Sequence, residues 1–249
     1  MFKGFYNLTS GMLTQERRLD VVANNMTNIG TAGYKSDRFT ASTFQDVLYT
    51  RIGNQDRDVH APLGNQSYIL APSQSYTDFG QGTLEETGLT LDFAIEGEGF
   101  FAIQTEDGTA YTRSGSFSLD EQGYLCLPGQ GRVLDADGQP ILMGTDKISA
   151  DAYGSLYTEQ GGFIARLGVF TFADTAALER NDQGLFVSAA APEAEGGPVH
   201  WRMLERSNVD LLLQMTEMMA SQRLLQSGAQ VTKIYDQVMS KITNDIGQL

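Results

Sequence analysis

Cysteine and histidine are scarce in this chain, and their scarcity excludes several kinds of chemical site. Cys126 is the single cysteine among 249 residues, so no intrachain disulfide and no cysteine-based metal site can form. His60 and His200 are the two histidines, and neither has a partner at metal-ligand spacing. We expect His60 in a solvated loop, His200 in a packed position, and Cys126 in a strand with no base beside it to make it a nucleophile. We therefore expect no metal, no cofactor and no catalytic residue.

Long apolar runs and excess positive charge are missing as well. No stretch approaches the roughly 18 to 20 apolar residues that cross a membrane. The first residues, interrupted by Lys3 and Asn7, lack the continuous apolar region of a secretory signal. The formal net charge of −14 argues against general nucleic-acid binding. If the protein leaves the cytoplasm, we expect a route other than a cleaved signal peptide.

The charge is unevenly distributed along the chain. Residues 1–35 carry four basic and two acidic side chains, and residues 202–249 carry five of each. Residues 36–201 carry eight basic and 24 acidic side chains. The two ends can therefore pack together without strong repulsion. The acidic middle is expected to face solvent, where like charge favours solubility.

Both ends have the periodicity of long helices that need partner helices. In the first helix the apolar side chains are spaced by three and four residues, with Gln15 in the one missing slot, and the last helix follows a similar but less regular spacing. Such spacing places them on one seam of each helix. The first helix is expected from about Phe2 to Asn28, and its seam is Phe5, Leu8, Met12, Leu19, Val22, Met26 and Ile29. The last helix, capped by Ser207 or Asn208, should end near Asn244. Its seam is Leu211, Met215, Met218, Leu225, Val231, Tyr235, Val238, Ile242 and Ile246. We expect both seams to be assembly interfaces.

Glycine and methionine qualify this expectation. Gly4 and Gly11 lie inside the first helix, and each costs roughly 1 kcal/mol relative to alanine, so the helix should be poorly ordered until it finds neighbours. The glycines of residues 30–33 should end it, because glycine accepts the left-handed conformation common after a helix. Met215, Met218 and Met219 lie together on the last helix, and flexible methionine side chains are typical of adaptable interfaces.

The middle of the chain is rich in strand signals. The 27 glycines exceed the average and favour a turn-rich β-protein. The pairs Asp107-Gly108 and Asp137-Gly138 suit tight turns between strands. Strands are expected at residues 93–95, 100–103, 111–119, 132–134, 154–157, 166–172 and 185–187, with a helical turn at 176–180 and a surface loop at 189–198. Within the connecting residues 34–82, residues 39–49 could form a short helix or an extended arm, residues 53–66 are expected as a loop, and residues 68–79 suggest extended segments.

The expected fold is therefore α+β. Residues 1–33 and 207–249 form a helical domain whose two helices pair as a coiled coil. Residues 34–82 connect it to a β-rich domain of residues 83–206.

Three loops resemble ligand sites only superficially. Gly97-Glu98-Gly99 lacks the third glycine of a dinucleotide loop, so we expect a turn or bulge beside a packed Phe100-Phe101 pair. Residues 30–36 lack the glycine-lysine order of a phosphate loop, since Tyr34 precedes Lys35. The segment starting at Asp135 has proline where a calcium loop needs its central glycine, so a hairpin turn is expected.

Three segments carry a family resemblance. Residues 24–35, NNMTNIGTAGYK, closely resemble the N-terminal motif of bacterial flagellar axial proteins of the rod and hook. Residues 92–101, DFAIEGEGFF, and 111–117, YTRSGSF, are similar to their central motif, and residues 205–210, ERSNVD, followed by Gln222-Arg223, to their C-terminal motif. The matching positions singled out are Asn24, Asn25, Asn28, Gly33, Tyr34, Lys35, Gly97, Gly99, Phe100, Phe101, Tyr111, Thr112, Arg113, Ser207, Asn208, Val209, Gln222 and Arg223. The length of the chain and its central motif are more similar to the rod proteins than to the longer hook protein. Leu224 stands where the family often has an aromatic residue.

The resemblance implies a structural subunit of the flagellar basal-body rod, not an enzyme. Such a subunit would polymerise through its terminal helices into the torque-transmitting shaft, with the β-domain outside. It would leave the cell unfolded through the flagellar type III export apparatus and contact other copies and neighbouring rod and hook proteins. Two alternatives remain at this point: a β-domain that binds carbohydrate or hydrolyses peptidoglycan, and a soluble coiled-coil adaptor.

Overall fold

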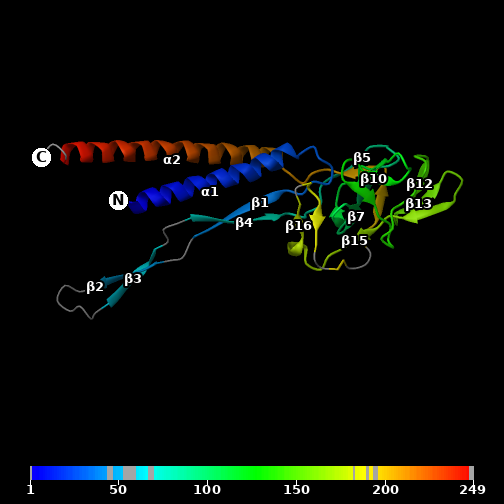
Figure 1. The fold of residues 1–249 in the computed structure, drawn as a ribbon, viewed down its shortest axis with the longest axis horizontal. Helices are drawn as coiled ribbons and strands as arrows, with labels where there is room; N and C mark the ends of the chain where they lie inside the picture. The colour runs from blue at the N-terminus through cyan, green and yellow to red at the C-terminus, as the bar shows by residue number, and fades with distance from the viewer. Residues whose placement is uncertain are drawn as a thin grey trace. The chain divides into compact units, whose positions relative to one another are not determined.

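The computed structural model describes residues 2–43, 47–52, 60–66, 70–181, 183–188, 191–192 and 196–246 (Figure 1). Helices at both ends and a β-rich middle confirm the expected α+β class. The chain forms two compact units: a first unit of residues 1–26, 37–76 and 210–249, and a second unit of residues 27–36 and 77–209. The chain thus passes between the two units four times. The three-part domain division expected from the sequence stays a prediction.

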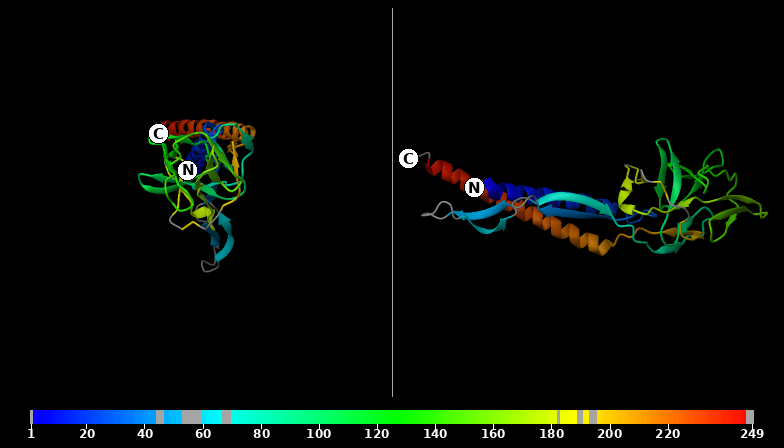
Figure 2. Two further views of the ribbon diagram at one scale, coloured as in Figure 1. Left: turned by 90° about the vertical axis from the view of Figure 1, so that its right-hand side faces the viewer. Right: turned by 90° about the horizontal axis from the view of Figure 1, so that it is seen from below.

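The first unit contains the two long helices, α1 (Phe2–Thr27) and α2 (Leu211–Ile246). They run antiparallel, with the N-terminus of α1 and the C-terminus of α2 at the same end (Figures 1 and 2). The expected extent of α1 is confirmed to within one residue. The expected cap of α2 is wrong, because Asp210 is the capping residue: its Oδ1 accepts the N–H groups of Leu212 at 2.9 Å and Leu213 at 3.2 Å.

Glycines allow close contact between the two helices. A Cβ atom on Gly228 would lie 2.9 Å from Cγ of Met12, and one on Gly4 would lie 3.2 Å from the Tyr235 hydroxyl oxygen. Gly11 has no such neighbour within 4 Å. Apart from Glu217, the buried and half-buried positions of α2 recur every three or four residues, at Gln214, Met218, Ser221, Leu225, Gly228, Thr232, Tyr235 and Met239. This row, the inner face of α2, is built largely from small and polar residues.

Residues 37–43, 47–52, 60–66 and 70–77 are the strands of an extended arm rather than part of a helix. Strand β1 (Asp37–Thr43) pairs with β4 (Leu70–Thr77), and β2 (Val47–Ile52) pairs antiparallel with β3 (His60–Gln66). The loop expected over residues 53–66 is wrong for residues 60–66, which are strand, while residues 53–59 lie outside the described residues. An extended hairpin satisfies its backbone groups by pairing, which a polar composition does not exclude.

Asn25 fastens the start of this arm to α1. Its side-chain nitrogen donates to the carbonyl oxygen of Asp37 at 2.8 Å, and its Oδ1 accepts the Asp37 N–H at 2.9 Å. The same amide nitrogen lies 3.4 Å from Oε1 of Gln214 on α2. Asn25 is only 1% exposed, so its polar atoms find within the first unit the partners that burial demands.

The second unit is a set of short, mostly antiparallel strands. Its main sheet has the order β16-β17-β8-β7-β11-β10-β9, with β15 also paired to β7. Smaller sheets are β12-β13-β14, β18-β6 and β19-β5. The bounds are β5 Leu84–Glu86, β6 Phe93–Ile95, β7 Phe100–Thr105, β8 Gly108–Thr112, β9 Ser118–Leu119, β10 Leu125–Leu127, β11 Gly131–Val133, β12 Ile148–Ala150, β13 Ser155–Thr158, β14 Phe163–Arg166, β15 Val169–Phe170, 3₁₀ turn η1 Thr175–Ala177, β16 Glu179–Arg180, β17 Phe186–Val187, β18 Val199–Trp201 and β19 Met203–Glu205.

Most expected strands are confirmed with shifted ends. The segment expected as one strand over 111–119 is interrupted after Thr112, and the one over 166–172 contains the end of β14 at Arg166 and the separate short strand β15. The helical turn expected at 176–180 occurs at Thr175–Ala177 and is followed by strand β16. Of the surface loop expected at 189–198, residues 189, 190 and 193–195 lie outside the described residues.

Strand β7 has apolar side chains on both faces, so it lies between two cores. Phe101 and Ile103 enter the larger core, whereas Phe100 and Ala102 enter a smaller aromatic core. Alternation of neighbouring residues between faces follows from the two-residue period of a strand. Gly97 (φ +86°) and Gly99 (φ +136°) precede the buried Phe100-Phe101 pair, which confirms the expected glycine turn beside it.

Four turns of the second unit share one local pattern. The side-chain oxygens of Asp120, Asp135, Asp151 and Asn181 each accept the backbone N–H groups two and four residues later, at 2.8–3.1 Å. Each is followed three residues later by a glycine with φ between +77° and +84°. The expected turn at Asp137-Gly138 is confirmed, and Asp135 is the residue that anchors it.

Candidate functional site: the junction network

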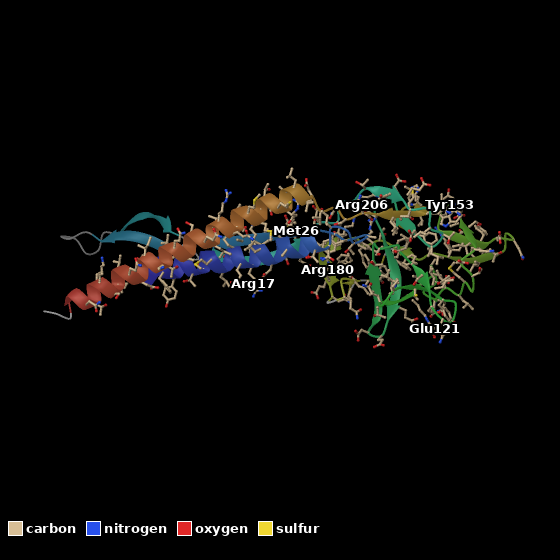
Figure 3. The ribbon with its side chains drawn as sticks, turned by 90° about the horizontal axis from the view of Figure 1, so that it is seen from above. Arg17, Met26, Glu121, Tyr153, Arg180 and Arg206 are labelled. Atoms are coloured by element: carbon tan, nitrogen blue, oxygen red, sulfur yellow. The ribbon has the colours of Figure 1, made fainter. Side chains whose placement is uncertain are left out.

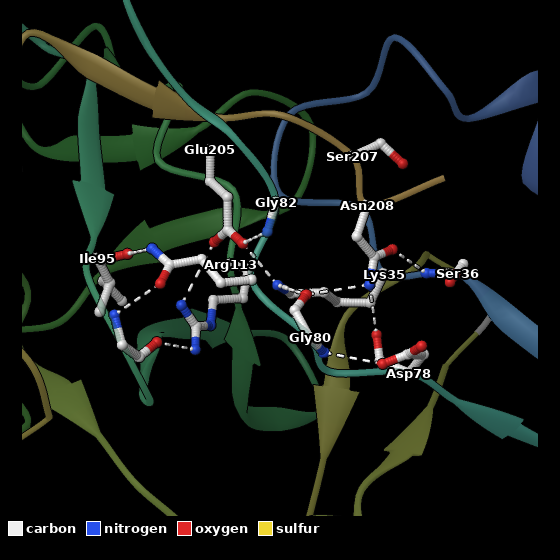
Figure 4. A network of polar contacts seen from close by, with 12 residues as sticks. Lys35, Ser36, Asp78, Gly80, Gly82, Ile95, Arg113, Glu205, Ser207 and Asn208 are labelled. Carbon is white, nitrogen blue, oxygen red and sulfur yellow. Dashed lines mark hydrogen bonds and ion pairs between the residues drawn. The ribbon is translucent and has the colours of Figure 1, made fainter. Parts of the chain in front are cut away.

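The chain segments that enter and leave the second unit meet at a buried cluster of charged and polar groups, which we call the junction network (Figure 4). Its side chains are Lys35, Arg113, Glu205 and Asn208, and its backbone groups belong to Ser36, Asp78, Gly80, Gly82 and Gly97. All these residues belong to the second unit.

Glu205 is the centre of the junction network. Its carboxylate is 1% exposed and receives the Lys35 ammonium on Oε1 at 2.6 Å and the Arg113 guanidinium on Oε2 at 3.3 Å. The N–H group of Gly82 donates to Oε1 as well, at 2.8 Å. Glu205 is the last residue of β19, directly before the segment that leads to α2. One carboxylate therefore joins three parts of the chain that are far apart in sequence.

Each of the two cations also donates one hydrogen bond to a backbone carbonyl oxygen. Lys35 Nζ donates to Gly80 at 2.9 Å, and Arg113 Nη2 donates to Gly97 at 2.6 Å. Burial lowers the pKa of the Lys35 ammonium below its ordinary value, and the Glu205 carboxylate opposes that shift. Burial likewise lowers the pKa of Arg113, again against the effect of Glu205. The shared carboxylate is thus what allows two positive charges to be buried together.

Asn208 joins its own segment of the chain by hydrogen bonds to two others, those of Ser36 and of Asp78 and Gly80. Its Oδ1 accepts the N–H of Ser36 at 2.8 Å, and its Nδ2 donates to the carbonyl oxygens of Asp78 at 2.8 Å and Gly80 at 3.0 Å. The Asp78 N–H in turn donates to the Ser36 carbonyl at 2.8 Å. Asn208 is fully engaged here, which explains why it does not cap α2.

Gly33 brings the segment after α1 against the centre of the network. Its φ is +67°, and a Cβ atom there would lie 2.3 Å from the carbonyl carbon of Arg113. Its N–H donates to the Glu205 carbonyl oxygen at 2.7 Å. Only glycine fits a positive φ combined with so close a backbone approach. The expected helix terminator at this glycine is therefore confirmed, and it has a packing reason as well.

Arg180 supports the same segment from the other side. Its guanidinium lies 4.7 Å above the Tyr34 ring and 5.2 Å above the Phe186 ring, and its Nη2 donates to the Lys35 carbonyl at 2.7 Å. No sequence motif drew attention to Arg180. Asp78, Gly80 and Gly82 were equally hidden, because they act through the backbone or a short turn.

The positions singled out by the family resemblance divide into two groups. Gly33, Lys35, Gly97, Arg113 and Asn208 meet in the junction network. Phe100, Phe101, Tyr111, Thr112 and Val209 are buried in the second unit, as is Gly99. Asn25 is hydrogen-bonded to the backbone of Asp37 in the arm. Asn24, Gln222 and Arg223 are exposed on the helices, and Asn28, Tyr34 and Ser207 are half-buried. Glu205, which completes the network, lay inside the C-terminal motif without being singled out.

The predicted helix seams are only partly covered within the chain. Val22 is buried, and Leu8, Met12, Leu19, Met26, Ile29, Met218, Leu225 and Tyr235 are half-buried. Phe5, Leu211, Met215, Val231, Val238 and Ile242 are exposed. Ile246 is helical, but its side chain lies outside the described residues. Figure 3 shows side chains projecting outward along both helices. The role of these seams in assembly stays a prediction.

The scarce reactive residues have ordinary surroundings. Cys126 is half-buried in β10 with Sγ 3.3 Å from the Ser118 hydroxyl, and His200 Nε2 lies 2.6 Å from a Glu96 carboxylate oxygen at the surface. The side chain of His60 is outside the described residues. Within the described part of the chain, no three histidine, cysteine or acidic residues are placed to hold a metal ion. Neither described helix is long and apolar enough to cross a lipid bilayer.

Comparison with known proteins agrees with the three motifs. Residues 5–35 match the family model of the flagella basal body rod protein, residues 94–169 that of the flagellar hook protein FlgE/F/G D1 domain, and residues 202–245 that of the flagellar basal body rod FlgEFG protein C-terminal region. The flagellar basal-body rod protein FlgG of Bacillus subtilis (strain 168) is 34% identical over 98% of this chain and 99% of its own length. The chain belongs to the flagellar basal-body rod protein family.

Two further relatives are named as a rod protein and as a protein of the hook-basal body complex. The flagellar basal-body rod protein FlgF of Mesorhizobium japonicum is 33% identical over 92% of this chain and 91% of its own length. The flagellar hook-basal body complex protein FlhO of Bacillus subtilis (strain 168) is 28% identical, with full coverage of both chains. The family resemblance read from residues 24–35, 92–117 and 205–223 is thereby confirmed.

Proposed function

We propose that the chain is a structural subunit of the flagellar basal-body rod that polymerises through α1 and α2 into the axial drive shaft. The family membership and the names of its relatives support the rod assignment. The observation that carries the polymerisation step is the exposed apolar surface of α2. Ten of its large apolar side chains are between 37% and 74% exposed in the single chain. Such a surface is typical of a protein interaction site.

The pairing of α1 with α2 would act as a coiled coil within each subunit. The row of Gln214, Met218, Ser221 and Leu225 on the inner face of α2 has the spacing of such a seam, and the Asn25–Gln214 contact would fix its register. The larger apolar residues are left over for neighbouring subunits. Burying a half-exposed valine or leucine in an assembly contributes on the order of 1 kcal/mol, so ten of them supply a substantial part of the assembly energy.

The junction network would then transmit load between the helices and the β-rich unit. Three of the four chain crossings, those at residues 36–37, 76–77 and 209–210, lie beside this network. Its bonds among Lys35, Arg113 and Glu205 are charge-assisted and therefore stronger than neutral ones. A shaft that carries torque needs such multiple attachment. Partners under this proposal are further copies of the chain, neighbouring rod and hook proteins and the flagellar type III export apparatus. The location would be the basal body, reached without a cleaved signal peptide, and the chain would perform no catalytic step.

A pair of substitutions on the outer side of α2 tests the proposal. Val231 and Val238 are 43% and 50% exposed, so replacing both by serine should leave the thermal unfolding of the isolated chain unchanged. Each variant chain should lose about 2 kcal/mol per contact with a neighbour, roughly thirtyfold in affinity. We expect basal bodies without a complete rod in electron micrographs and loss of swimming in soft agar.

A matched control uses the polar side of the same helix. Gln230→Ser with Gln237→Ser changes two exposed residues of the same helical segment without removing apolar surface. This control should assemble and swim normally. Normal rods and motility in the Val231→Ser, Val238→Ser chain would refute polymerisation through α2.

A further inference from the structure

A cavity of about 350 Å³ lies beside the junction network, within the second unit. Among the residues that line it are Phe79, Phe100, Phe172, Glu98, Arg113 and Thr175. A mostly apolar wall, a few polar groups and a volume of roughly 300–1,000 Å³ are typical of sites that bind small molecules. Nothing described so far for this chain uses the cavity.

Three phenylalanine rings form the apolar wall. Phe79 and Phe172 each pack edge-on against Phe100, with ring centroids 5.6 Å and 6.0 Å apart. Phe100 and Phe172 are buried members of the smaller aromatic core, and Phe79 packs against that core. The contact surface for an apolar ligand is therefore already ordered, which reduces the entropy lost on binding.

Arg113 supplies the polar end of the cavity. Its side chain is 4% exposed, and its Nη1 and Nη2 atoms donate to Glu205 and to the Gly97 carbonyl oxygen (Figure 4). Its Nε–H has no hydrogen-bond partner among the described residues. A buried donor without an acceptor is costly and uncommon. The acceptor that binds a guanidinium most strongly is a carboxylate or a phosphate, because the hydrogen bond is then charge-assisted.

The volume of the cavity limits the size of the ligand. At about 30 Å³ for each water-sized group, 350 Å³ holds roughly a dozen non-hydrogen atoms. A single water molecule could accept the Nε–H of Arg113, but it would leave the phenylalanine wall without a contact. A ligand that uses both ends of the cavity combines one anionic group with one ring or branched aliphatic group.

We propose that this cavity binds a small carboxylate whose apolar body packs on Phe79, Phe100 and Phe172 and whose oxygen accepts the Nε–H of Arg113. The binding site goes beyond the proposed function, because it is separate from polymerisation through α1 and α2. Glu98 is exposed, lines the cavity and interacts electrostatically with Arg113. Its negative charge opposes a bound carboxylate and keeps the affinity low.

Nuclear magnetic resonance of the full-length chain labelled with ¹⁵N-arginine tests the proposal. The probe is phenylacetate, and the control is phenylacetamide, which has the same shape without the charge. Phenylacetate should shift the Arg113 Nε–H signal, identified by its loss in Arg113→Lys, with a dissociation constant on the order of 1 mM for so small a ligand. Phenylacetamide should bind roughly tenfold more weakly.

Two variants with matched controls locate the site without removing Arg113. Thr175→Trp places a large side chain against the cavity and should abolish the shift, whereas Thr109→Trp, at an exposed position of β8, should not. Glu98→Gln should tighten binding roughly three- to tenfold, because it removes a like charge. Glu106→Gln, at an exposed position before β8, should leave the affinity unchanged.

Three results would each overturn the proposal. The first is an unshifted Nε–H signal at about 10 mM phenylacetate, well above the expected dissociation constant. The second is equal affinity for phenylacetate and phenylacetamide, which would remove Arg113 from ligand recognition. The third is binding that survives Thr175→Trp, which would place the ligand elsewhere. None of the three bears on polymerisation, which the substitutions on α2 test separately.

Discussion

Replacing Glu205 by glutamine removes the carboxylate that two buried cations share, with almost no change in shape. The amide oxygen can still accept one hydrogen bond, but Lys35 and Arg113 lose their counter-charge at sites only 1% and 4% exposed. Breaking a buried ion pair by neutralising one partner costs about 3–5 kcal/mol. Because two cations are affected, we expect the free energy of unfolding of the second unit to fall by at least the upper part of that range.

Urea unfolding of the full-length chain, followed by the fluorescence of Trp201, measures this loss directly. Trp201 is the single tryptophan and lies in β18, next to the strand that carries Glu205, with its indole N–H bonded to the Thr90 carbonyl at 2.8 Å. The matched control is Glu85→Gln, since Glu85 pairs with Arg206 at 3.4 Å while both are more than half exposed. Such a surface pair contributes about 0–1 kcal/mol.

A difference below about 1 kcal/mol between Glu205→Gln and Glu85→Gln would refute the assignment of Glu205 as the centre of the network, because a solvated pair already accounts for that much. A double-mutant cycle makes the result specific. When Lys35→Met is combined with Glu205→Gln, Arg113 is the one cation that has lost its carboxylate partner, whereas Glu205→Gln alone leaves two such cations. The double variant should therefore be more stable than the sum of the two single losses predicts.

Three further outcomes follow from the turns and contacts of the second unit. Gly33→Ala should cost at least about 2 kcal/mol in urea unfolding, because of its left-handed φ and the Arg113 backbone, whereas Gly30→Ala, with open space around it, should be within about 0.5 kcal/mol of the parent. Although partial desolvation acts in the opposite direction, backbone N–H groups lower the pKa of Asp151 below its ordinary value. Its stabilisation is thus present above that ordinary value and lost as pH falls through the lowered one, so Asp151→Asn should flatten the acid decline in melting temperature. Arg180→Lys should cost about 1–2 kcal/mol in thermal unfolding, since lysine cannot stack on Tyr34 and donate to the Lys35 carbonyl in the same geometry.

The parts of the fold that sequence predicts well are those governed by local rules. The extent of α1 follows from apolar periodicity and a terminating glycine, and the short strands follow from apolar runs between turn residues. The cap of α2 is not fixed by the sequence because Ser207, Asn208 and Asp210, which lie within four residues of one another, are all good capping residues. Long-range contacts decide which of them caps the helix, because the Asn208 side chain is already hydrogen-bonded to Ser36, Asp78 and Gly80.

The junction network shows where local rules stop. Lys35 could be recognised as a motif position, but nothing in its neighbours reveals that its charge is balanced by a residue 170 positions later. Arg180 has no motif at all, and its stacking on Tyr34 depends on a strand pairing that pattern alone does not fix. Residues 39–49 fit either a short helix or an extended arm because their composition favours neither, and cross-strand pairing makes their described part strand.

The four anchored turns bear on the order in which the chain folds. Each turn closes within five residues, so the hairpins of the second unit can form early, with little loss of chain entropy. The Lys35–Glu205 bond must wait until most of the chain has been ordered, because it closes a loop of 170 residues. We therefore expect the ends of the chain to be the last parts fixed in position. A chain that folds in this order leaves its two apolar helices without fixed positions until its β-rich unit is complete, so association through the helices follows the folding of that unit.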